Sequence, residues 1–207
     1  MRHKWIECLL LLVLTISGCG PHKVQRDAQA PVEEWPNYGN DPGSSRHSPL
    51  TEITKDNVQY LKVAWVYHTG DLSYGNSTWN GKKVWAKSTF EATPLFVDGT
   101  LFVVSSFNRI IALDPETGRE KWTFDPKLDR IGWYGDAFTC RGLATWVDPQ
   151  RQPGEMCHRT IYVAALEGRL VAVDSEGRGP CPAFGTNGEV ALTAGINIPI
   201  KGEYHWV

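Results

Sequence analysis

The sequence predicts an all-β fold built from repeated units of the β-propeller kind. The run Leu-Phe-Val-Val-Ser-Ser-Phe-Asn-Arg-Ile-Ile-Ala-Leu-Asp at 101–114 recurs without a gap as Ile-Tyr-Val-Ala-Ala-Leu-Glu-Gly-Arg-Leu-Val-Ala-Val-Asp at 161–174. Similarity at a fixed period of tens of residues indicates a repeat architecture. The composition agrees, because nine Trp and 20 Gly among 207 residues suit a protein in which glycine makes turns and tryptophan fills the space between sheets.

Each copy of the repeat has the pattern of a β-hairpin. An apolar run leads to a residue that tolerates a positive φ, Asn108 or Gly168, and a second apolar run ends in Asp114 or Asp174. The first copy continues through a Pro-Glu-Thr-Gly turn into a strand that opens on Trp122. Three or four strands per unit, stacked on similar units, suggest a propeller blade. We expect both Asp residues to cap the turns that follow them, and Trp122 to pack between blades.

The segments between the repeats predict shorter elements and loops. Residues 54–61 predict one or two helical turns that begin at Thr54, and residues 63–67 predict a strand around Trp65. That strand is similar to 122–124 and would be the outer strand of a blade whose other strands lie at the far end of the chain. Three polar stretches are predicted as exposed loops, where binding groups usually lie: 70–89, 125–138 and 147–156.

The first 34 residues are expected to lie outside the fold. Met1-Arg-His-Lys4 is basic, residues 9–14 are apolar, and Ile16-Ser-Gly-Cys19 is a small-residue processing site. This order predicts a signal peptide over 1–19. The polar, non-periodic residues 20–34 then predict a flexible tether.

The Cys at the processing site resembles the bacterial lipobox, in which that residue is lipidated. Lipidation of Cys19 would anchor a periplasmic protein to the cell envelope. The alternative is an ordinary secretory signal with an incidental Cys. The apolar core is too short to span a membrane in the mature protein, and no later segment has enough consecutive apolar residues.

The remaining cysteines predict one disulfide. If 160–166 pairs with 169–174, Cys157 lies opposite about residue 178, and Cys181 is within reach. We therefore predict a Cys157–Cys181 bridge in an oxidising compartment, although the spacing does not prove the connectivity. Cys140 would be left over.

Several function classes find no support. A net charge of −2 gives no attraction to nucleic acid, and the six His lack the spacing of a zinc site. The chain has no nucleophile motif, phosphate loop or dinucleotide fingerprint. Two complete hairpin units cannot close a ring, so we expect this chain to be the N-terminal fragment of a longer protein, with 35–207 a partial propeller domain.

Four motifs resemble the pyrroloquinoline-quinone (PQQ)-dependent dehydrogenases over essentially all of 35–207. They are Trp35-Pro-Asn-Tyr-Gly39, Glu91-Ala-Thr-Pro94, Cys140-Arg141-Gly142 and Gly202-Glu-Tyr204. The second and third are specific in combination. The chain is most similar to the glucose, quinate and shikimate branch of the quinoproteins. The resemblance implies an eight-bladed propeller that holds the quinone and a divalent cation, usually calcium, on its axis.

The resemblance assigns two cofactor-binding residues, Glu91 and Arg141. PQQ carries three carboxylates, and the planar guanidinium of an Arg offers a matching fork of donors. Without the motifs, Arg141 would be taken for a surface residue paired with an Asp, and Glu91 for a solvated carboxylate at the head of a strand. The family's Asp base and metal ligands match positions beyond Val207. No catalytic residue is therefore expected in this chain, which alone should be inactive.

Two departures from the family bear on the substrate. Gly135 and Asp136 replace the adjacent cysteines of the alcohol-oxidising branch, so their disulfide is absent. Ala137 replaces a His of the glucose-oxidising enzymes. Glucose is therefore a doubtful substrate.

The resemblance implies oxidation of a sugar, polyol or alcohol, with hydride transfer to the quinone and onward transfer to ubiquinone or cytochrome c. An alternative is a lipid-anchored propeller without cofactor that binds proteins in outer-membrane assembly. A third is a truncated product with no function of its own.

Overall fold

The computed structural model contains strands and one short 3-10 helix. It describes residues 34–41, 43–131, 134 and 137–197, all within the unit Val32–Val207. The elements, in chain order, are η1 (Val58–Tyr60), β1 (Ser77–Trp79), β2 (Lys82–Val84), β3 (Leu95–Val97), β4 (Thr100–Val104), β5 (Ile110–Leu113), β6 (Glu120–Phe124), β7 (Ala144–Val147), β8 (Arg159–Ala165), β9 (Arg169–Asp174) and β10 (Glu189–Ala191). The predicted all-β class is confirmed. Within the described residues, no helix has the length and apolar character needed to cross a bilayer.

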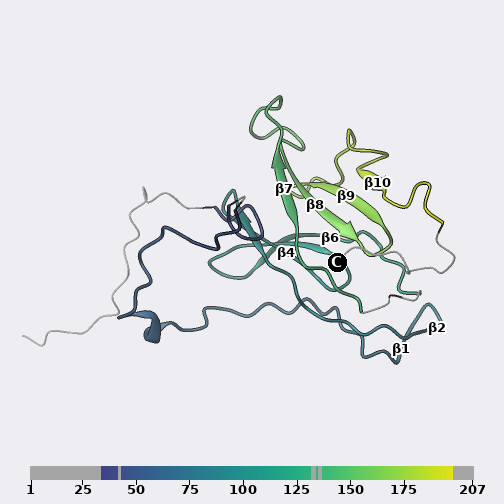
Figure 1. Ribbon diagram of the computed structural model, residues 1–207, viewed down its shortest axis with the longest axis horizontal. Helices are drawn as coiled ribbons and strands as arrows, with labels where there is room; N and C mark the ends of the chain where they lie inside the picture. The colour runs from purple at the N-terminus through teal and green to yellow at the C-terminus, as the bar shows by residue number, and fades with distance from the viewer. Residues whose placement is uncertain (1–33, 42, 132–133, 135–136, 198–207) are drawn as a thin grey trace, which may run out of the picture. The chain divides into compact units, whose positions relative to one another are not determined.

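Two four-stranded antiparallel meanders carry the repeat (Figure 1). One sheet has the order β3-β4-β5-β6 and the other β7-β8-β9-β10, with the two repeat copies as the middle hairpins β4–β5 and β8–β9. The predicted turn residues take the left-handed conformation, with φ of 60° at Asn108 and 74° at Gly168. Ile161 pairs with Val173, within one residue of the predicted register. Each copy is thus half of a four-stranded blade.

The main hydrophobic core lies between the two sheets. Phe102 and Ile110 of the first sheet belong to one cluster with Ile161, Val163 and Val171 of the second, and each is at most 1% exposed. Because side chains alternate across a strand, one face of each middle hairpin supplies these residues. Full burial of such a side chain stabilises the fold by about 1.5–3 kcal/mol. The apolar interface therefore holds the two sheets together.

A tryptophan from one unit packs on a turn glycine of the next. A Cβ added to Gly177, in the turn after β9, would lie 2.5 Å from Cγ of Trp122 on β6. A Cβ on Gly118, in the turn after β5, would lie 2.5 Å from the ring of Trp65, whose Nε1 donates to the carbonyl of Pro115 at 3.1 Å. Only glycine allows an approach this close. Packing of Trp122 between units is therefore confirmed, and Trp65 repeats it.

The Arg of each repeat makes a second link of the same kind. Arg109 Nη2 donates to the carbonyl of Thr69, and Arg169 Nη2 donates to the carbonyl of Pro126 at 2.8 Å. Each acceptor comes four residues after a docking tryptophan. The stretch 63–71 therefore lies against the first sheet as 120–128 lies against the second.

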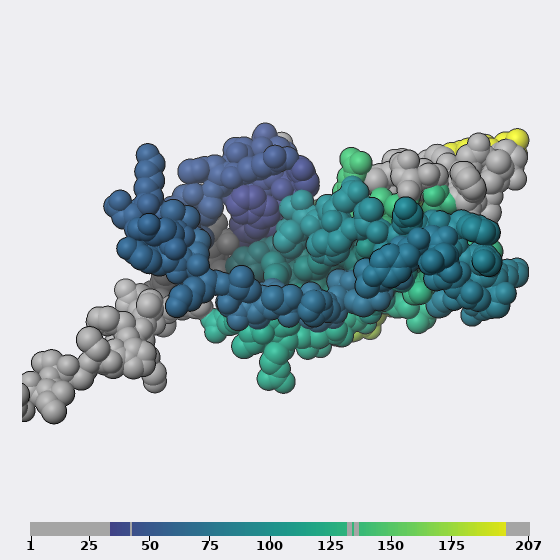
Figure 2. All heavy atoms as spheres, turned by 90° about the horizontal axis from the view of Figure 1, so that it is seen from below, coloured from purple at the N-terminus to yellow at the C-terminus, as the bar shows by residue number. Residues whose placement is uncertain are grey.

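The predicted strand at 63–67 is absent. The stretch passes over the surface as an extended segment (Figure 2) without strand assignment. Within the described part of the chain no neighbouring strand pairs with its backbone, and a strand exists only through such pairing. Trp65 nevertheless packs as Trp122 does. That 63–67 is the outer strand of a blade completed by strands from the far end of the chain stays a prediction, because no such strands are among the described residues.

Two other predictions are corrected. The predicted loop 70–89 contains the hairpin β1–β2, whose turn residues Asn80 and Gly81 have φ of 47° and 75°. Asn-Gly between short strands is a strong hairpin signal, because both residues tolerate the positive φ that the tight turn needs. The predicted helical turn is present in part: the N–H of Val58 donates to the carbonyl of Thr54 at 3.0 Å, and the turn at 55–57 continues into η1, the only stretch of the described residues with helix assignment.

Candidate cofactor-binding site

The structure brings the two predicted cofactor-binding segments together. Residues 87–93 and 138–142 run parallel, with isolated bridges that pair Ser88 with Phe138 and Thr93 with Gly142. Their ends are fixed by the N–H of Phe138 donating to Lys87 O at 2.7 Å and by the N–H of Thr93 donating to Arg141 O at 2.9 Å. The pairing sets Glu91 and Arg141 beside each other, although about fifty residues separate them in the chain.

Glu91 and Arg141 form an exposed ion pair. Arg141 Nε lies 3.6 Å from Glu91 Oε2, and the two side chains are 65% and 47% exposed. Surface pairs of this kind contribute at most about 1 kcal/mol, so the pair is not needed to hold the fold. Among described residues, Glu91 is the only carboxylate in ion-pair range of Arg141. The donors of the guanidinium therefore stay available to an anionic ligand.

The residues next to Arg141 anchor it to the core. Cys140 is 7% exposed and Leu143 is 8% exposed, and both belong to the cluster between the sheets. Burial raises the pKa of the Cys140 thiol, which makes it an inert packing group. The segment 138–142 thus points Cys140 inward and Arg141 outward. The Glu91–Arg141 pair therefore lies on two paired segments, one of which is fixed to the core by Cys140 and Leu143.

One buried hydroxyl within the segment 138–142 has no hydrogen-bond partner in the described structure. Thr139 is 4% exposed, and its Oγ1 makes no hydrogen bond in the described structure. Buried polar atoms in folded proteins almost always have a partner. Thr139 lies two residues before Arg141, so a polar ligand held by Arg141 is suited to supply one. Arg141 offers charged donors, Glu91 an acceptor and Thr139 an unpaired hydroxyl, a set that fits a polar cofactor with carboxylate groups.

The guanidinium of Arg130 lies between two aromatic rings, a contact that the sequence did not predict. The guanidinium carbon of Arg130 lies 4.1 Å from the ring centre of Trp79 and 3.8 Å from that of Phe107. Its Nε is buried without a hydrogen-bond partner, and burial lowers the pKa of the guanidinium. No spacing in the sequence announces this contact, because three separate segments provide it. It joins the β1–β2 hairpin, through Trp79, to the turn between β4 and β5 and to the loop after β6.

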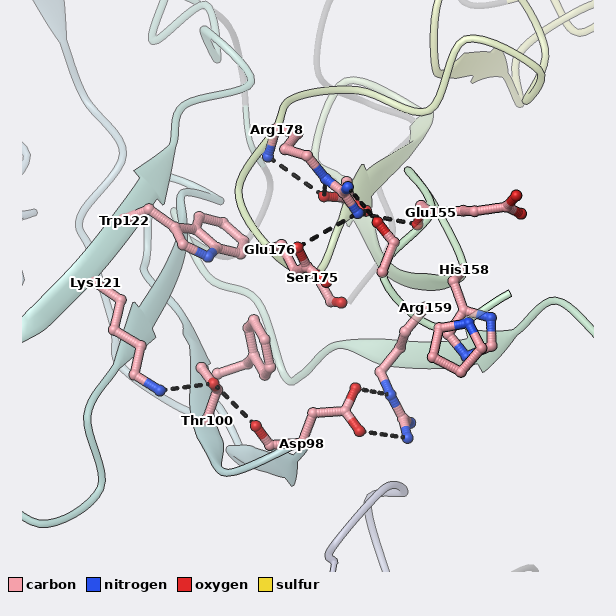
Figure 3. Close-up of a pocket in the computed structure, with 14 residues that line it drawn as sticks. Asp98, Thr100, Lys121, Trp122, Glu155, His158, Arg159, Ser175, Glu176 and Arg178 are labelled. Atoms are coloured by element: carbon pink, nitrogen blue, oxygen red, sulfur yellow. Dashed lines mark hydrogen bonds and ion pairs between the residues drawn. The ribbon is translucent and has the colours of Figure 1, made fainter. Parts of the chain in front are cut away.

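The structure has a large cavity that is separate from the Glu91–Arg141 pair. It has a volume of about 670 Å³ and lies between the turns at the outer edge of the two sheets (Figure 3). Arg159 Nε lies 2.6 Å from Asp98 Oδ2, and Arg178 Nε lies 2.7 Å from Asp174 Oδ2. The guanidinium groups lining it are therefore neutralised by carboxylates. Neither predicted cofactor-binding residue lines this cavity.

A second, more apolar cavity adjoins the segment that carries Glu91. Its volume is about 560 Å³, and the stretch 65–72 forms one wall. Phe90 and Ala92 line the other wall with Leu101 of β4. The two neighbours of Glu91 thus point toward an apolar space, while Glu91 itself faces Arg141.

The predicted disulfide is present in the structure. Cys157 and Cys181 are bonded with their Cα atoms 5.8 Å apart, and Cys140 is a free buried thiol. The N–H of Cys157 donates to Asp174 Oδ1 at 2.7 Å. The bridge therefore closes the open end of the β8–β9 hairpin next to the Asp that ends β9.

Some predicted positions lie outside the described residues. These include Cys19 in the signal segment, Gly135 and Asp136 at the departures from the family pattern, and the motif at 202–204. Ala137 is described and buried, at 7% exposure. The described residues contain no cluster of three or more His, Cys, Asp or Glu able to hold a metal ion.

Comparison with known proteins identifies the domain. The family model "Glucose/ethanol/alcohol dehydrogenase, beta-propeller domain" of the PQQ type matches residues 35–206. Quinoprotein glucose dehydrogenase A of Acinetobacter calcoaceticus is 33% identical over 196 residues, which are 89% of this chain and 24% of that protein. The glycerol dehydrogenase large subunit of Gluconobacter oxydans (strain 621H) is 36% identical over 180 residues, 86% of this chain and 23% of the relative.

A solved structure agrees with these relatives. Quinohemoprotein alcohol dehydrogenase from Comamonas testosteroni matches with a TM-score of 0.58 and 30% identity, over 82% of this chain and 21% of that one. The chain therefore spans about a quarter of the length of the relatives that it matches. Fold, family model and relatives together show that the chain belongs to the PQQ-dependent quinoprotein dehydrogenases.

Proposed function

We propose that the protein carrying this chain oxidises a sugar, polyol or alcohol with PQQ as the hydride acceptor. The observation that carries the proposal is the exposed Glu91–Arg141 pair, held on two paired segments at the positions that the family resemblance assigns to the cofactor. The printed activities of the relatives, on glucose, glycerol and alcohol, support this substrate class.

The roles of the residues follow from their chemistry. Arg141 would bind a carboxylate of the quinone through its free donors, since charge-assisted bonds between Arg and carboxylate are short and directional. Glu91 would keep the guanidinium oriented and accept a hydrogen bond from the cofactor. When bound, the quinone supplies the hydride acceptor. The general base and the ligands of a divalent cation, calcium in our proposal, would come from outside the described residues.

The proposal predicts a specific effect of Arg141→Ala in the full-length protein. Loss of a charged hydrogen bond costs about 1.5–3 kcal/mol, so the dissociation constant for PQQ should rise roughly 10- to 100-fold. Tryptophan fluorescence of the apoprotein during a PQQ titration measures it. Arg119→Ala, another exposed Arg, is the control and should bind as wild type does. Equal affinities for all three proteins would remove Arg141 from the cofactor site, and a wild-type protein that does not bind PQQ would favour the protein-binding alternative.

We also propose that the protein is lipid-anchored through Cys19, faces the periplasm, and passes electrons to ubiquinone or cytochrome c. The Cys157–Cys181 disulfide supports an oxidising compartment. Labelling cells with a fatty acid should mark the wild-type protein and not Cys19→Ala. Equal label on both proteins would contradict the anchor.

A further inference from the structure

Two polar side chains in the turn between β4 and β5 each contact one of the two cofactor-binding segments. Ser106 and Asn108 are 4% and 0% exposed. Turns usually lie at the surface, where water satisfies their polar groups. A buried turn must find protein partners for such groups, and these partners show what the turn supports.

Ser106 holds the segment that carries Glu91. Its Oγ donates to the carbonyl of Thr89 at 2.6 Å, two residues before Glu91. The aromatic ring next to it strengthens the same junction, because Phe107 packs edge-to-face on Phe138 with ring centres 5.2 Å apart. Thr89 and Phe138 are themselves bonded through the Thr89 N–H.

Asn108 holds the segment that carries Arg141. Its Nδ2 donates to the carbonyl of Thr139 at 3.3 Å, two residues before Arg141. Its Oδ1 accepts the N–H of Leu166 at 2.9 Å, which lies in the corresponding turn of the second sheet. One buried amide thus joins the Arg141 segment to both repeats.

The second repeat shows that the backbone alone does not require these side chains. Leu166 and Gly168 occupy the positions equivalent to Ser106 and Asn108. The conformation needs only a residue with positive φ, and Gly168 meets that need at lower strain than an Asn. The hydroxyl and the amide of the first repeat therefore serve contacts that the second repeat lacks.

We propose that Ser106 and Asn108 are positioning residues that set Glu91 and Arg141 for cofactor binding. The inference rests on the proposed function. Each side chain fixes a carbonyl two residues before a cofactor-binding residue, one on each segment. Small misplacements of groups in a binding site have large effects on ligand binding and rate. Loss of either hydrogen bond should therefore weaken cofactor binding, although neither Ser106 nor Asn108 contacts the cofactor in this proposal.

Two adjacent serines provide the test in the full-length protein. Ser105 is 1% exposed and its Oγ accepts the N–H of Arg109 at 3.1 Å, a bond internal to its own turn. Ser105→Ala and Ser106→Ala therefore remove the same group from equally buried sites, and both should lower the denaturation midpoint similarly. Only Ser106→Ala should raise the dissociation constant for PQQ, about tenfold. Hydrogen exchange should also quicken at the amides of Thr89 and Thr93 in that variant.

A second pair of variants protects the test from a folding failure. Asn108→Gly keeps the positive φ and loses both amide bonds, whereas Asn80→Gly changes an exposed turn residue with a φ of 47°. Asn108→Gly should weaken PQQ binding at least fivefold, and Asn80→Gly should not. If wild type binds PQQ and the variants of each pair bind alike, the positioning role is wrong. If wild type itself does not bind PQQ, the proposed function fails instead.

Discussion

Asp114 and Asp174 occupy the same place in the two repeats and cap the turns that follow, as predicted. Asp114 Oδ1 accepts the N–H of Thr117 at 2.8 Å. Asp174, with a side chain only 1% exposed, accepts Arg178 Nε at 2.7 Å and the N–H of Cys157. Burial alone would raise the pKa of Asp174, but the bonds from Arg178 and Cys157 outweigh it and lower that pKa. The second Asp thus joins a turn, a cation and a disulfide.

We therefore expect Asp174→Asn to lower the free energy of unfolding by about 1–3 kcal/mol at pH 7, because the buried carboxylate that accepts bonds from Arg178 and from the N–H of Cys157 is replaced by a neutral amide. A folded-state pKa below the unfolded value near 3.9 gives a contribution that is complete above that value and lost as the pH falls through the folded pKa. Denaturation with urea at pH 7 and pH 3 should show a smaller difference at the lower pH. Asp114→Asn, at the exposed cap, is the control. A difference that does not change with pH would contradict the ionic role.

At the scale of elements, neighbouring units are joined by a tryptophan on a glycine and an arginine on a carbonyl. The first contact can be tested with two glycines of similar conformation. Gly177 has a φ of 78° and faces Trp122, whereas Gly154 has a φ of 87° and open space around its Cα. Substitution by Ala strains the backbone at both, and only Gly177 would also collide with a ring.

We expect Gly154→Ala to cost about 1–2 kcal/mol of stability from its left-handed backbone. Gly177→Ala should cost about 1–3 kcal/mol more, because the added methyl overpacks the contact with Trp122. Guanidinium denaturation followed by tryptophan fluorescence measures both. Equal losses would show that Trp122 moves aside at little cost.

The sequence predicted the two hairpins of the repeat, the strand that opens on Trp122 and the helical turn before β1, and it missed β1, β2, β7 and β10. The hairpins β4–β5 and β8–β9 have apolar runs about a turn residue, which local patterning reveals. β10 has three residues, and β7 lies in a stretch for which no strand was predicted, so tertiary pairing decides them. At the site, the family motifs predicted Glu91 and Arg141. The positioning role of Ser106 and Asn108 was not predicted, because the equivalent residues of the second repeat are Leu and Gly and the repeat pattern therefore shows no polar position there.

At the scale of the molecule, the Cys157–Cys181 disulfide closes the second sheet at its outer edge. The bridge spans 24 positions, and a loop of that length restricts the unfolded chain enough to contribute about 3 kcal/mol. Reduction should therefore lower the denaturation midpoint of the wild-type protein. The variant with Cys157→Ser and Cys181→Ser should start at the lower midpoint and not respond to reductant. A wild-type denaturation midpoint that does not change on reduction would show that the disulfide does not stabilise the fold.

The paired links between units have a consequence for how such a chain tolerates insertions. Trp65 and Thr69 dock on the first sheet as Trp122 and Pro126 dock on the second, with the same short spacing within each pair. Yet the stretch from Trp122 to Ile161 is longer than the one from Trp65 to Leu101. Since each joint is made by residues only four positions apart, we expect the loops between units to tolerate changes of length and sequence without loss of the tryptophan and arginine contacts.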